Sequence, residues 1–205
     1  MKTKVLAILL CSAVSVCGFT GCSNEVKDTD ASVSISEQND NTNYKTVKPP
    51  VDGWTIEELL SVTYVCGKQL SYPINLDSLA DGISLDLDNA FYGNEFGNAD
   101  LRYNDDFLGV CVFRPGSEPT LPPESIKSIT ISKEDSDIAE QIISNGIKLG
   151  DSIATLYECF GEPDELDETG DIKNAKYFDK NDKTKGIFFF INSSDDTIKS
   201  ILIEG

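Results

Sequence analysis

The chain has 205 residues, of which 40% are hydrophobic, which is enough for one folded domain or two small ones. It carries 35 acidic and 17 basic side chains, and this formal net charge of −18 disfavours a nucleic acid partner. Histidine is absent, so the chain lacks the usual base for serine and cysteine nucleophiles and the commonest metal ligand. We therefore expect no catalytic residue, no metal site and no cofactor.

The N-terminal segment has the pattern of a bacterial lipoprotein precursor. Two lysines precede an apolar run over residues 5–16, which is too short for a full membrane span. The motif Phe19-Thr20-Gly21-Cys22 then resembles a lipobox, in which a small residue precedes the acylated cysteine. We predict a signal peptide over 1–21 and lipidation of Cys22, with an uncleaved signal anchor as the alternative.

A polar segment follows the lipobox. Residues 22–50 are rich in Ser, Asn, Asp, Thr and Lys and end in two prolines. Few large apolar side chains occur there to offset the entropy of ordering the chain, so we predict a disordered tether. The expected location is the extracytoplasmic face of a bacterial cell membrane, with the folded part held near the lipid anchor.

The first half of the remaining chain, 51–135, contains mixed helix and strand signals. We expect a short helix after the N-cap Thr55 and a loop with exposed aromatic side chains over 86–100. The expected strands are 62–65, 101–103, 109–113 and 126–131, with a helical turn at 76–79 and a proline-rich loop over 114–124.

The second half, 136–205, has cleaner signals. Ile153, Leu156, Tyr157 and Phe160 recur at helical spacing, and we expect Asp151 to cap this helix and Gly161 to end it. Three strands are predicted at 176–178, 186–191 and 198–203. In 186–191 both faces are apolar, so one face is expected to hold the helix and the other a sister repeat or a partner.

The two halves share a sequence pattern. The segment Ser125-Ile126-Lys127-Ser128-Ile129-Thr130-Ile131 returns as Thr197-Ile198-Lys199-Ser200-Ile201-Leu202-Ile203. Each copy follows an aromatic strand that begins at a glycine, Gly109 or Gly186. Matches in the same order along both halves indicate a duplication, and two such units are expected to share one core.

A family resemblance rests on the second half. Residues 146–151, the helix end Phe160-Gly161-Glu162-Pro163 and the following strands resemble the small lipoproteins of outer-membrane assembly. They also resemble the tandem-repeat β-lactamase-inhibitor protein. The resemblance implies an α+β fold of two tandem repeats, each a helix on an antiparallel sheet. It further implies binding to other proteins and supplies no catalytic residue.

Aromatic side chains of the first half are the candidates for partner binding. Phe91, Tyr92, Phe96 and Tyr103 lie in or beside the expected loop, where exposed aromatic side chains favour protein interfaces. Packing into the core is the alternative for each of them.

Cysteines and acidic loops suggest weaker hypotheses. Cys66 and Cys111 either form a disulfide or lie buried as free thiols, and Cys159 lacks an imidazole partner for nucleophilic chemistry. The acidic segments 86–89, 104–106 and 179–186 offer oxygen ligands for a cation, but none has the full spacing of a calcium loop.

These observations favour a membrane-anchored extracytoplasmic lipoprotein that is non-catalytic and binds a protein or another envelope component. The alternative is a lipoprotein that senses a small ligand or a cation, and an enzyme of unknown type is third.

Overall fold

The computed structural model describes residues 44–115, 125–136 and 138–205. All of them belong to one unit of the chain, Val33–Gly205. The predicted signal peptide, the lipidation residue Cys22 and the first part of the predicted tether lie outside the described residues. Within the described ranges, no helix is long and apolar enough to cross a membrane.

The first half contains one short α-helix and several strands. Their bounds are α1 Ile56–Ser61, β1 Thr63–Val65, β2 Lys68–Gln69, the 3₁₀ turn η1 Leu76–Ser78, β3 Ile83–Leu85, β4 Phe91–Tyr92, β5 Gly97–Tyr103, β6 Asp106–Arg114 and β7 Ser125–Ser132.

The second half contains one further α-helix and longer strands. Their bounds are η2 Ala139–Gln141, β8 Ile142–Ser144, α2 Ile153–Phe160, β9 Glu165–Thr169, β10 Ile172–Asp179, β11 Asp182–Asn192 and β12 Thr197–Glu204.

Both α-helices begin at a side-chain cap. The Glu58 backbone N–H donates to Thr55 Oγ1, and the Thr55 N–H donates to Glu58 Oε2, which completes a capping box at α1. At α2 the cap is Ser152 and not Asp151, because the Thr155 N–H donates to Ser152 Oγ. The Asp151 carboxylate instead accepts from the Lys148 N–H, which closes the preceding turn.

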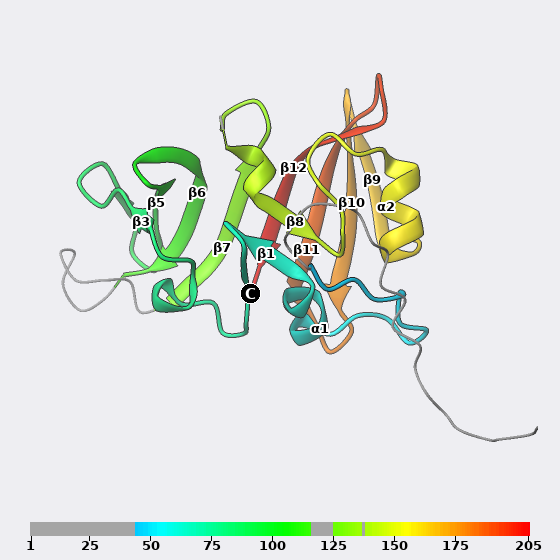
Figure 1. The fold of residues 1–205 in the computed structure, drawn as a ribbon, viewed down its shortest axis with the longest axis horizontal. Helices are drawn as coiled ribbons and strands as arrows, with labels where there is room; N and C mark the ends of the chain where they lie inside the picture. The colour runs from blue at the N-terminus through cyan, green and yellow to red at the C-terminus, as the bar shows by residue number, and fades with distance from the viewer. Residues whose placement is uncertain (1–43, 116–124, 137) are drawn as a thin grey trace, which may run out of the picture. The chain divides into compact units, whose positions relative to one another are not determined.

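Two antiparallel sheets contain all of the strands in the described ranges (Figure 1). The small sheet has the order β2-β1-β8. The large sheet has nine strands in the order β3-β5-β6-β7-β12-β11-β10-β9, with β4 also paired to β5. β7 and β12, which carry the repeated segment, lie next to each other, with Ile131 opposite Ile201 and Ile129 opposite Ile203. The large sheet is therefore continuous across both halves of the chain.

The predicted fold class of two tandem helix-plus-sheet repeats is wrong. The structure is a β-rich fold, with 47% strand and 13% helix, and most of it is antiparallel sheet. The physical reason lies in the packing of α1. Trp54, just before α1, packs its ring against Phe160 at 5.4 Å between centroids, and its Nε1 donates to the Phe160 carbonyl. The Lys180 N–H in turn donates to the Trp54 carbonyl. The first helix is thus attached to the second half, and Figure 1 shows both helices beside β10 and β11.

One hydrophobic core joins the helices, the small sheet and one face of the large sheet. Phe160 of α2 packs edge to face on Phe189 of β11 at 5.1 Å between centroids. Leu59 of α1, Val65 of β1 and Ile203 of β12 belong to the same core cluster and are fully buried. We call this face of the large sheet the inner face and the opposite one the outer face.

The last part of the predicted tether is bound to the fold. Residues 44–50, which we call the strap, contact Asn145, a residue that is buried between the strap and α2. The Val47 N–H donates to Asn145 Oδ1, and Asn145 Nδ2 donates to the carbonyls of Val47 and Cys159. The Asn145 amide therefore helps to hold the strap against the fold, together with Tyr64, whose hydroxyl accepts from the Lys45 N–H.

Candidate functional site: the outer face of the large sheet

The side chains of β11 alternate between the two faces of the sheet. Ile187 and Phe189 point to the inner face and are fully buried in the core. Phe188 and Phe190 point to the outer face and are not part of that core cluster. The prediction that one face holds the helix is confirmed by the contact of Phe160 with Phe189. The other face cannot meet a sister repeat, because both halves lie in the same sheet.

A row of apolar side chains crosses the outer face from strand to strand. Phe188 of β11 lies opposite Leu202 of β12, which lies opposite Thr130 of β7, which lies opposite Val110 of β6. Residues directly opposite in an antiparallel pair have neighbouring side chains on one face. We call Phe188, Leu202, Thr130 and Val110 the central row.

Further rows flank the central row on the same face. On one side Phe190 lies opposite Ser200, which lies opposite Ser132. On the other side Ser128 lies opposite Val112, which lies opposite Asn98, which lies opposite Phe91. The outer face therefore combines aromatic and aliphatic side chains with small hydroxyl groups.

Exposure differs along these rows. Phe188 is only 7% exposed because neighbours on its own face cover it, including Phe178, whose ring lies 5.5 Å away between centroids. Val110 is 40% exposed and Phe91 is 67% exposed, which are high values for apolar side chains in strands. An antiparallel sheet that faces water on one side usually presents polar side chains there. The outer face departs from that rule.

Charged groups lie at one end of the central row. Lys176 of β10 lies opposite Phe188 and forms ion pairs with Asp167 at 2.5 Å and Glu165 at 3.4 Å, both on β9. Its hydrogen bond to Asp167 raises the pKa of the Lys176 ammonium, which therefore stays charged. Two carboxylates around one ammonium leave this end of the row acidic.

The other end of the central row is also acidic. Asp100 of β5 lies opposite Val110, and Arg102 Nη2 lies 3.5 Å from Asp100 and 3.4 Å from Asp86. The pKa of Asp86 is lowered, first by hydrogen bonds from the Asn89 side chain and then by Arg102. The apolar row thus ends in one cation and two anions on each side, so each end has a net negative charge.

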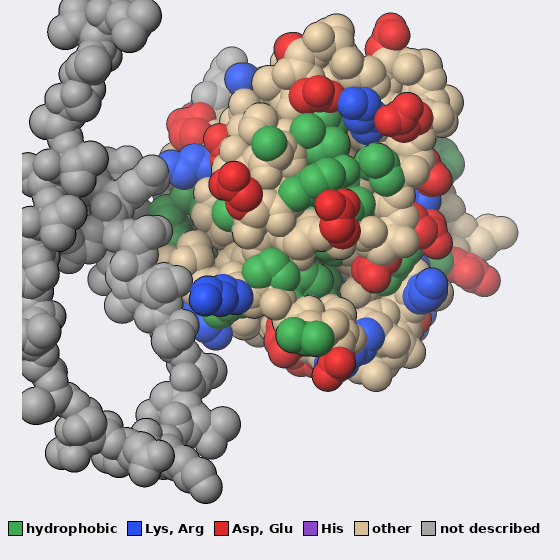
Figure 2. Space-filling view, turned by 90° about the vertical axis from the view of Figure 1, so that its right-hand side faces the viewer, with side chains coloured by type: hydrophobic (Ala, Val, Ile, Leu, Met, Phe, Trp, Pro, Cys, Tyr) green, Lys and Arg blue, Asp and Glu red, His purple; other side chains and the backbone are tan. Residues whose placement is uncertain are grey.

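Acidic side chains also occur on the side of the molecule that Figure 2 presents. There, hydrophobic side chains gather near the centre of the view, and red acidic groups lie around them together with fewer blue basic groups.

The structure separates the four aromatic side chains that the sequence suggested for partner binding. Phe91 lies on the outer face, and Phe96 lies under Lys127 Nζ, 5.4 Å from its ring centroid. Tyr92 lies opposite Gly97 and packs edge to face on the buried Phe113 at 5.9 Å. Tyr103 lies at the far end of β5, opposite Ile83 and against the core. Phe91 and Phe96 thus lie near one end of β5, and Tyr103 lies at the other.

Several outer-face residues were not among the sequence candidates: Phe178, Phe188, Phe190, Leu202, Val110 and Val112. Phe188 and Phe190 of β11 could have been identified from the sequence, because both faces of 187–191 are apolar. For β6 the same signal existed, since Val110 and Val112 alternate with the buried Cys111 and Phe113.

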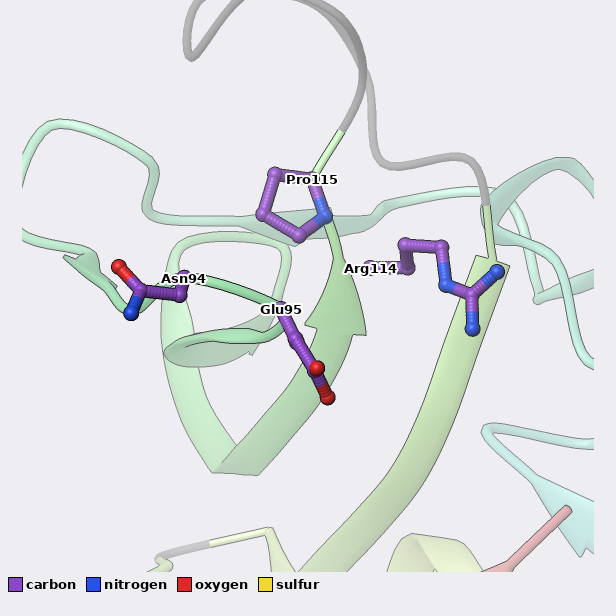
Figure 3. Close-up of a pocket in the computed structure, with 4 residues that line it drawn as sticks. All are labelled: Asn94, Glu95, Arg114 and Pro115. Atoms are coloured by element: carbon purple, nitrogen blue, oxygen red, sulfur yellow. The ribbon is translucent and has the colours of Figure 1, made fainter.

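A shallow open pocket of about 460 Å³ lies near Phe96 (Figure 3). Asn94 and Glu95 line it from the β4–β5 connection, and Arg114 and Pro115 line it from the end of β6. In Figure 3 the Glu95 and Arg114 side chains point in different directions, and no ion pair joins them. The pocket offers one cation and one anion and no paired acid and base.

The three cysteines after the strap are free thiols in the described structure. Cys66 lies in the turn between β1 and β2, and Cys111 lies in the middle of β6, so the two do not form a disulfide. Burial raises the pKa of both thiols to about 12, and it also raises the pKa of Cys159. These thiols are protonated at neutral pH, which is the less nucleophilic form.

In two of the three acidic segments considered for cation binding, carboxylates accept hydrogen bonds within local turns. Asp179 Oδ1 accepts from the Asn181 N–H, and Asp182 Oδ1 accepts from Thr184 Oγ1 and its N–H. In 86–89, Asp86 accepts from Asn89 and pairs with Arg102. Among the described residues, no group of three cysteine or carboxylate side chains is placed to hold a metal ion.

No protein-family model matches the chain, and searches of curated proteins and of solved structures found no significant match. The resemblance to the outer-membrane-assembly lipoproteins and the β-lactamase-inhibitor protein therefore stays an expectation from the sequence.

Proposed function

We propose that the chain is a lipid-anchored extracytoplasmic protein that binds another protein through the outer face of its large sheet. The observation that carries the proposal is the central row, where Phe188, Leu202, Thr130 and Val110 lie side by side on the face opposite the core cluster, with Val110 40% exposed and Phe188 covered by its neighbours. Grouped apolar side chains on a surface, surrounded by polar ones, are typical of protein interfaces.

The composition of the outer face supports this function. Aromatic side chains such as Phe178 and Phe190 supply large contact areas, and hydroxyl groups such as Thr130 and Ser200 supply hydrogen bonds. The charged ends of the central row form a polar rim. Such a role needs no catalytic group, because binding uses only shape, apolar area and charge.

The anchor part of the proposal comes from the lipobox at Cys22. Two acyl chains hold a protein stably at a membrane, whereas one gives reversible binding. The unaltered chain should incorporate radiolabelled palmitate, and a Cys22→Ala variant should not. Equal incorporation into both chains would contradict lipidation at this residue.

The binding part is tested by site-specific photocrosslinking in intact cells. A photoreactive residue at Val110 or at Phe190 reports on the outer face. A photoreactive residue at Leu166 is the matched control. It is 43% exposed, close to the 40% of Val110, but it lies opposite Ala175 on the other face of the sheet.

We expect the same crosslinked protein from Val110 and from Phe190, and no such product from Leu166. Products of equal yield from all three positions would show nonspecific contact and would contradict the proposal. The absence of any product from both outer-face positions would contradict it as well.

A further inference from the structure

The surface under the strap recognises an extended peptide backbone. Asn145 is 1% exposed, and both groups of its amide contact the same strap residue. Oδ1 accepts from the Val47 N–H at 2.8 Å, and Nδ2 donates to the Val47 carbonyl at 3.0 Å. The amide thus offers the donor and the acceptor that a neighbouring strand would offer, and any extended segment carries the two matching groups.

The Asn145 amide is positioned by the fold as well as by the strap. The Asn145 backbone N–H donates to the Val62 carbonyl at 2.7 Å, and Nδ2 also donates to the Cys159 carbonyl in α2 at 2.6 Å. Its φ of 47° lies in the left-handed region, which Asn adopts more readily than most residues. None of these contacts involves the strap, so they remain when the strap leaves. Oδ1 would then lose its Val47 donor, which favours the occupied state of the site.

Side chains of the strap are recognised next to this amide. The ring of Tyr44 packs edge to face on Tyr64 of β1 at 4.9 Å between centroids. The Lys45 N–H donates to Tyr64 Oη at 3.1 Å. Val47 is partly buried and packs against the core cluster. The site therefore accepts an aromatic ring and, three residues later, an aliphatic side chain.

Two glycines form the walls where the strap approaches most closely. A Cβ at Gly146 would lie 3.3 Å from Thr46 Cγ2, and one at Gly161 would lie 3.3 Å from Pro49 Cβ. Both distances are tight for nonbonded contacts, so a side chain at either glycine would crowd the strap. We call the surface formed by Tyr64, Asn145, Gly146, Cys159 and Gly161 the strap groove.

The strap is joined to the rest of the fold by a short exposed connection. Val51 is fully exposed, and Asp52 is exposed as well. The contacts of the strap are made with distant parts of the chain, since Val47 and Asn145 are 98 positions apart. A segment from another molecule could therefore make the same contacts.

Charge indicates which kind of segment fits. Residues 44–50 contain Lys45 and Lys48, both exposed, and no acidic residue, whereas the whole chain has a net charge of −18. A basic segment of another protein is attracted to such a molecule. A second copy of the chain has the same negative charge and is repelled.

We infer that the strap groove is a binding site for an extended basic segment of a partner protein, and that the chain's own strap occupies it until such a segment replaces it. The expected segment has an aromatic residue and an aliphatic residue three positions later. The groove is built on β1, the turn after β8 and the end of α2, which lie on the inner side of the large sheet. It is therefore separate from the outer face, and the inference depends on neither that interface nor the lipid anchor.

The test converts the strap into a separate peptide. A protease site inserted between Val51 and Asp52 allows the folded full chain to be cut at this exposed connection. The piece before the cut is removed by size exclusion, or is displaced by excess peptide if it stays bound. A fluorescent peptide with the sequence of residues 44–50 is then added, and its anisotropy measures binding. The uncut chain, whose strap is present at a high effective concentration, is the matched comparison.

We expect saturable binding of the strap peptide to the cut chain and binding weaker by about tenfold or more to the uncut chain. A peptide with Val47→Asp should also bind about tenfold more weakly, because a charge would enter an apolar site. The same seven residues in scrambled order are the control peptide. In the cut chain, Asn145→Asp should weaken binding by a similar factor, because it removes the donor to the Val47 carbonyl.

A second variant guards against loss of the fold by Asn145→Asp. Tyr64→Ala removes the ring contact with Tyr44 and leaves the core cluster intact, and it should also weaken binding. Peptides selected on the cut chain from a random library should contain an aromatic and an aliphatic residue at the spacing of Tyr44 and Val47, with basic residues beside them.

Three results would overturn the inference. The first is equal binding of the strap peptide and the scrambled peptide, or no saturable binding of either. The second is loss of the circular dichroism signal after the cut, which would show that the strap is a structural part of the fold. The third is an uncut chain that forms a dimer and becomes a monomer with excess strap peptide, which would assign the groove to the strap of a second copy.

Discussion

At the scale of single residues, Gly109 and Gly186 each allow a close approach to a neighbouring strand, β7 for Gly109 and β10 for Gly186. A Cβ at Gly109 would overlap the Thr130 carbonyl oxygen, and one at Gly186 would overlap the Tyr177 carbonyl oxygen. We expect Gly186→Ala to lower the free energy of unfolding by about 1–3 kcal/mol, because a backbone atom must move. Chemical denaturation measures the loss. The control is Gly170→Asn, where no atom lies within 4 Å and Asn tolerates the positive φ. Equal losses in both variants would contradict the explanation.

Phe91 and Tyr92 are neighbours in β4 with opposite environments. Phe91→Ala should change the free energy of unfolding by less than about 0.5 kcal/mol, since that side chain is mostly exposed. Tyr92→Ala should cost about 2 kcal/mol, because it removes the contact with Phe113. Thermal or chemical denaturation of both variants checks the order. A larger loss for Phe91→Ala would show that its side chain is covered.

The buried thiols make stability depend on alkaline pH. The pKa of Cys66 and of Cys111 is raised from 9.0 to about 12, so the folded chain retains protons that the unfolded chain loses. The stabilisation that the two protonated thiols give to the folded state is therefore full below pH 9, and it is lost as the pH rises from 9 towards 12. Each such proton changes the free energy of unfolding by about 1.4 kcal/mol per pH unit in that window.

Denaturation at a series of pH values above 9 measures this slope. Burial also raises the pKa of Tyr177, so part of the slope should survive in a Cys111→Ala variant. That variant starts from a lower stability but should show a shallower fall with pH. An unchanged slope would show that the Cys111 thiol does not titrate differently in the two states.

At the scale of elements, the strap depends on the amide of Asn145. Asn145→Asp keeps the size of the side chain but removes the donors to Val47 and Cys159, which lie 3.0 and 2.6 Å from Nδ2. A buried carboxylate beside two carbonyls should cost about 2–4 kcal/mol. We also expect faster proteolysis at Lys45 and Lys48. The control Lys48→Ala, at an exposed position of the same strap, should be close to neutral in stability.

Local elements could be predicted from the sequence where local interactions determine them. Each of the helices α1 and α2 begins at a capping side chain and ends within a few residues, at a following strand for α1 and at a glycine for α2. Both helices were therefore expected from the sequence. The partner of α1 was not predictable, because Trp54 meets Phe160 across 106 positions of the chain. β9 was missed, since Glu165, Asp167 and their neighbours are all exposed and give no alternation of apolar and polar residues.

The outer face could be predicted only in part for a related reason. The apolar residues on both sides of 187–191 indicated a second apolar face at that strand. Which strands extend this face depends on the pairing of β7 with β12, and nothing local in either strand specifies it. The aromatic candidates were chosen for a polar loop, and that criterion does not separate Phe91 on the outer face from Tyr92 on the inner one.

At the scale of the whole molecule, the pairing of β7 with β12 joins both halves around one core. Ile129, Ile131, Ile201 and Ile203 lie at this junction and are fully buried. We therefore expect a single cooperative unfolding transition, with Trp54 fluorescence and far-ultraviolet circular dichroism changing together. Two separate transitions would indicate that residues 51–135 and 136–205 unfold independently.

The exposed strand β9 also affects whether copies of the chain can associate edge to edge. It leaves one edge of the large sheet without a partner in the described structure, and such an edge invites hydrogen bonding to a second molecule. Glu165, Asp167 and Glu168 place three carboxylates along its five residues. Two such edges brought together would set like charges side by side, which opposes the association of two copies through β9.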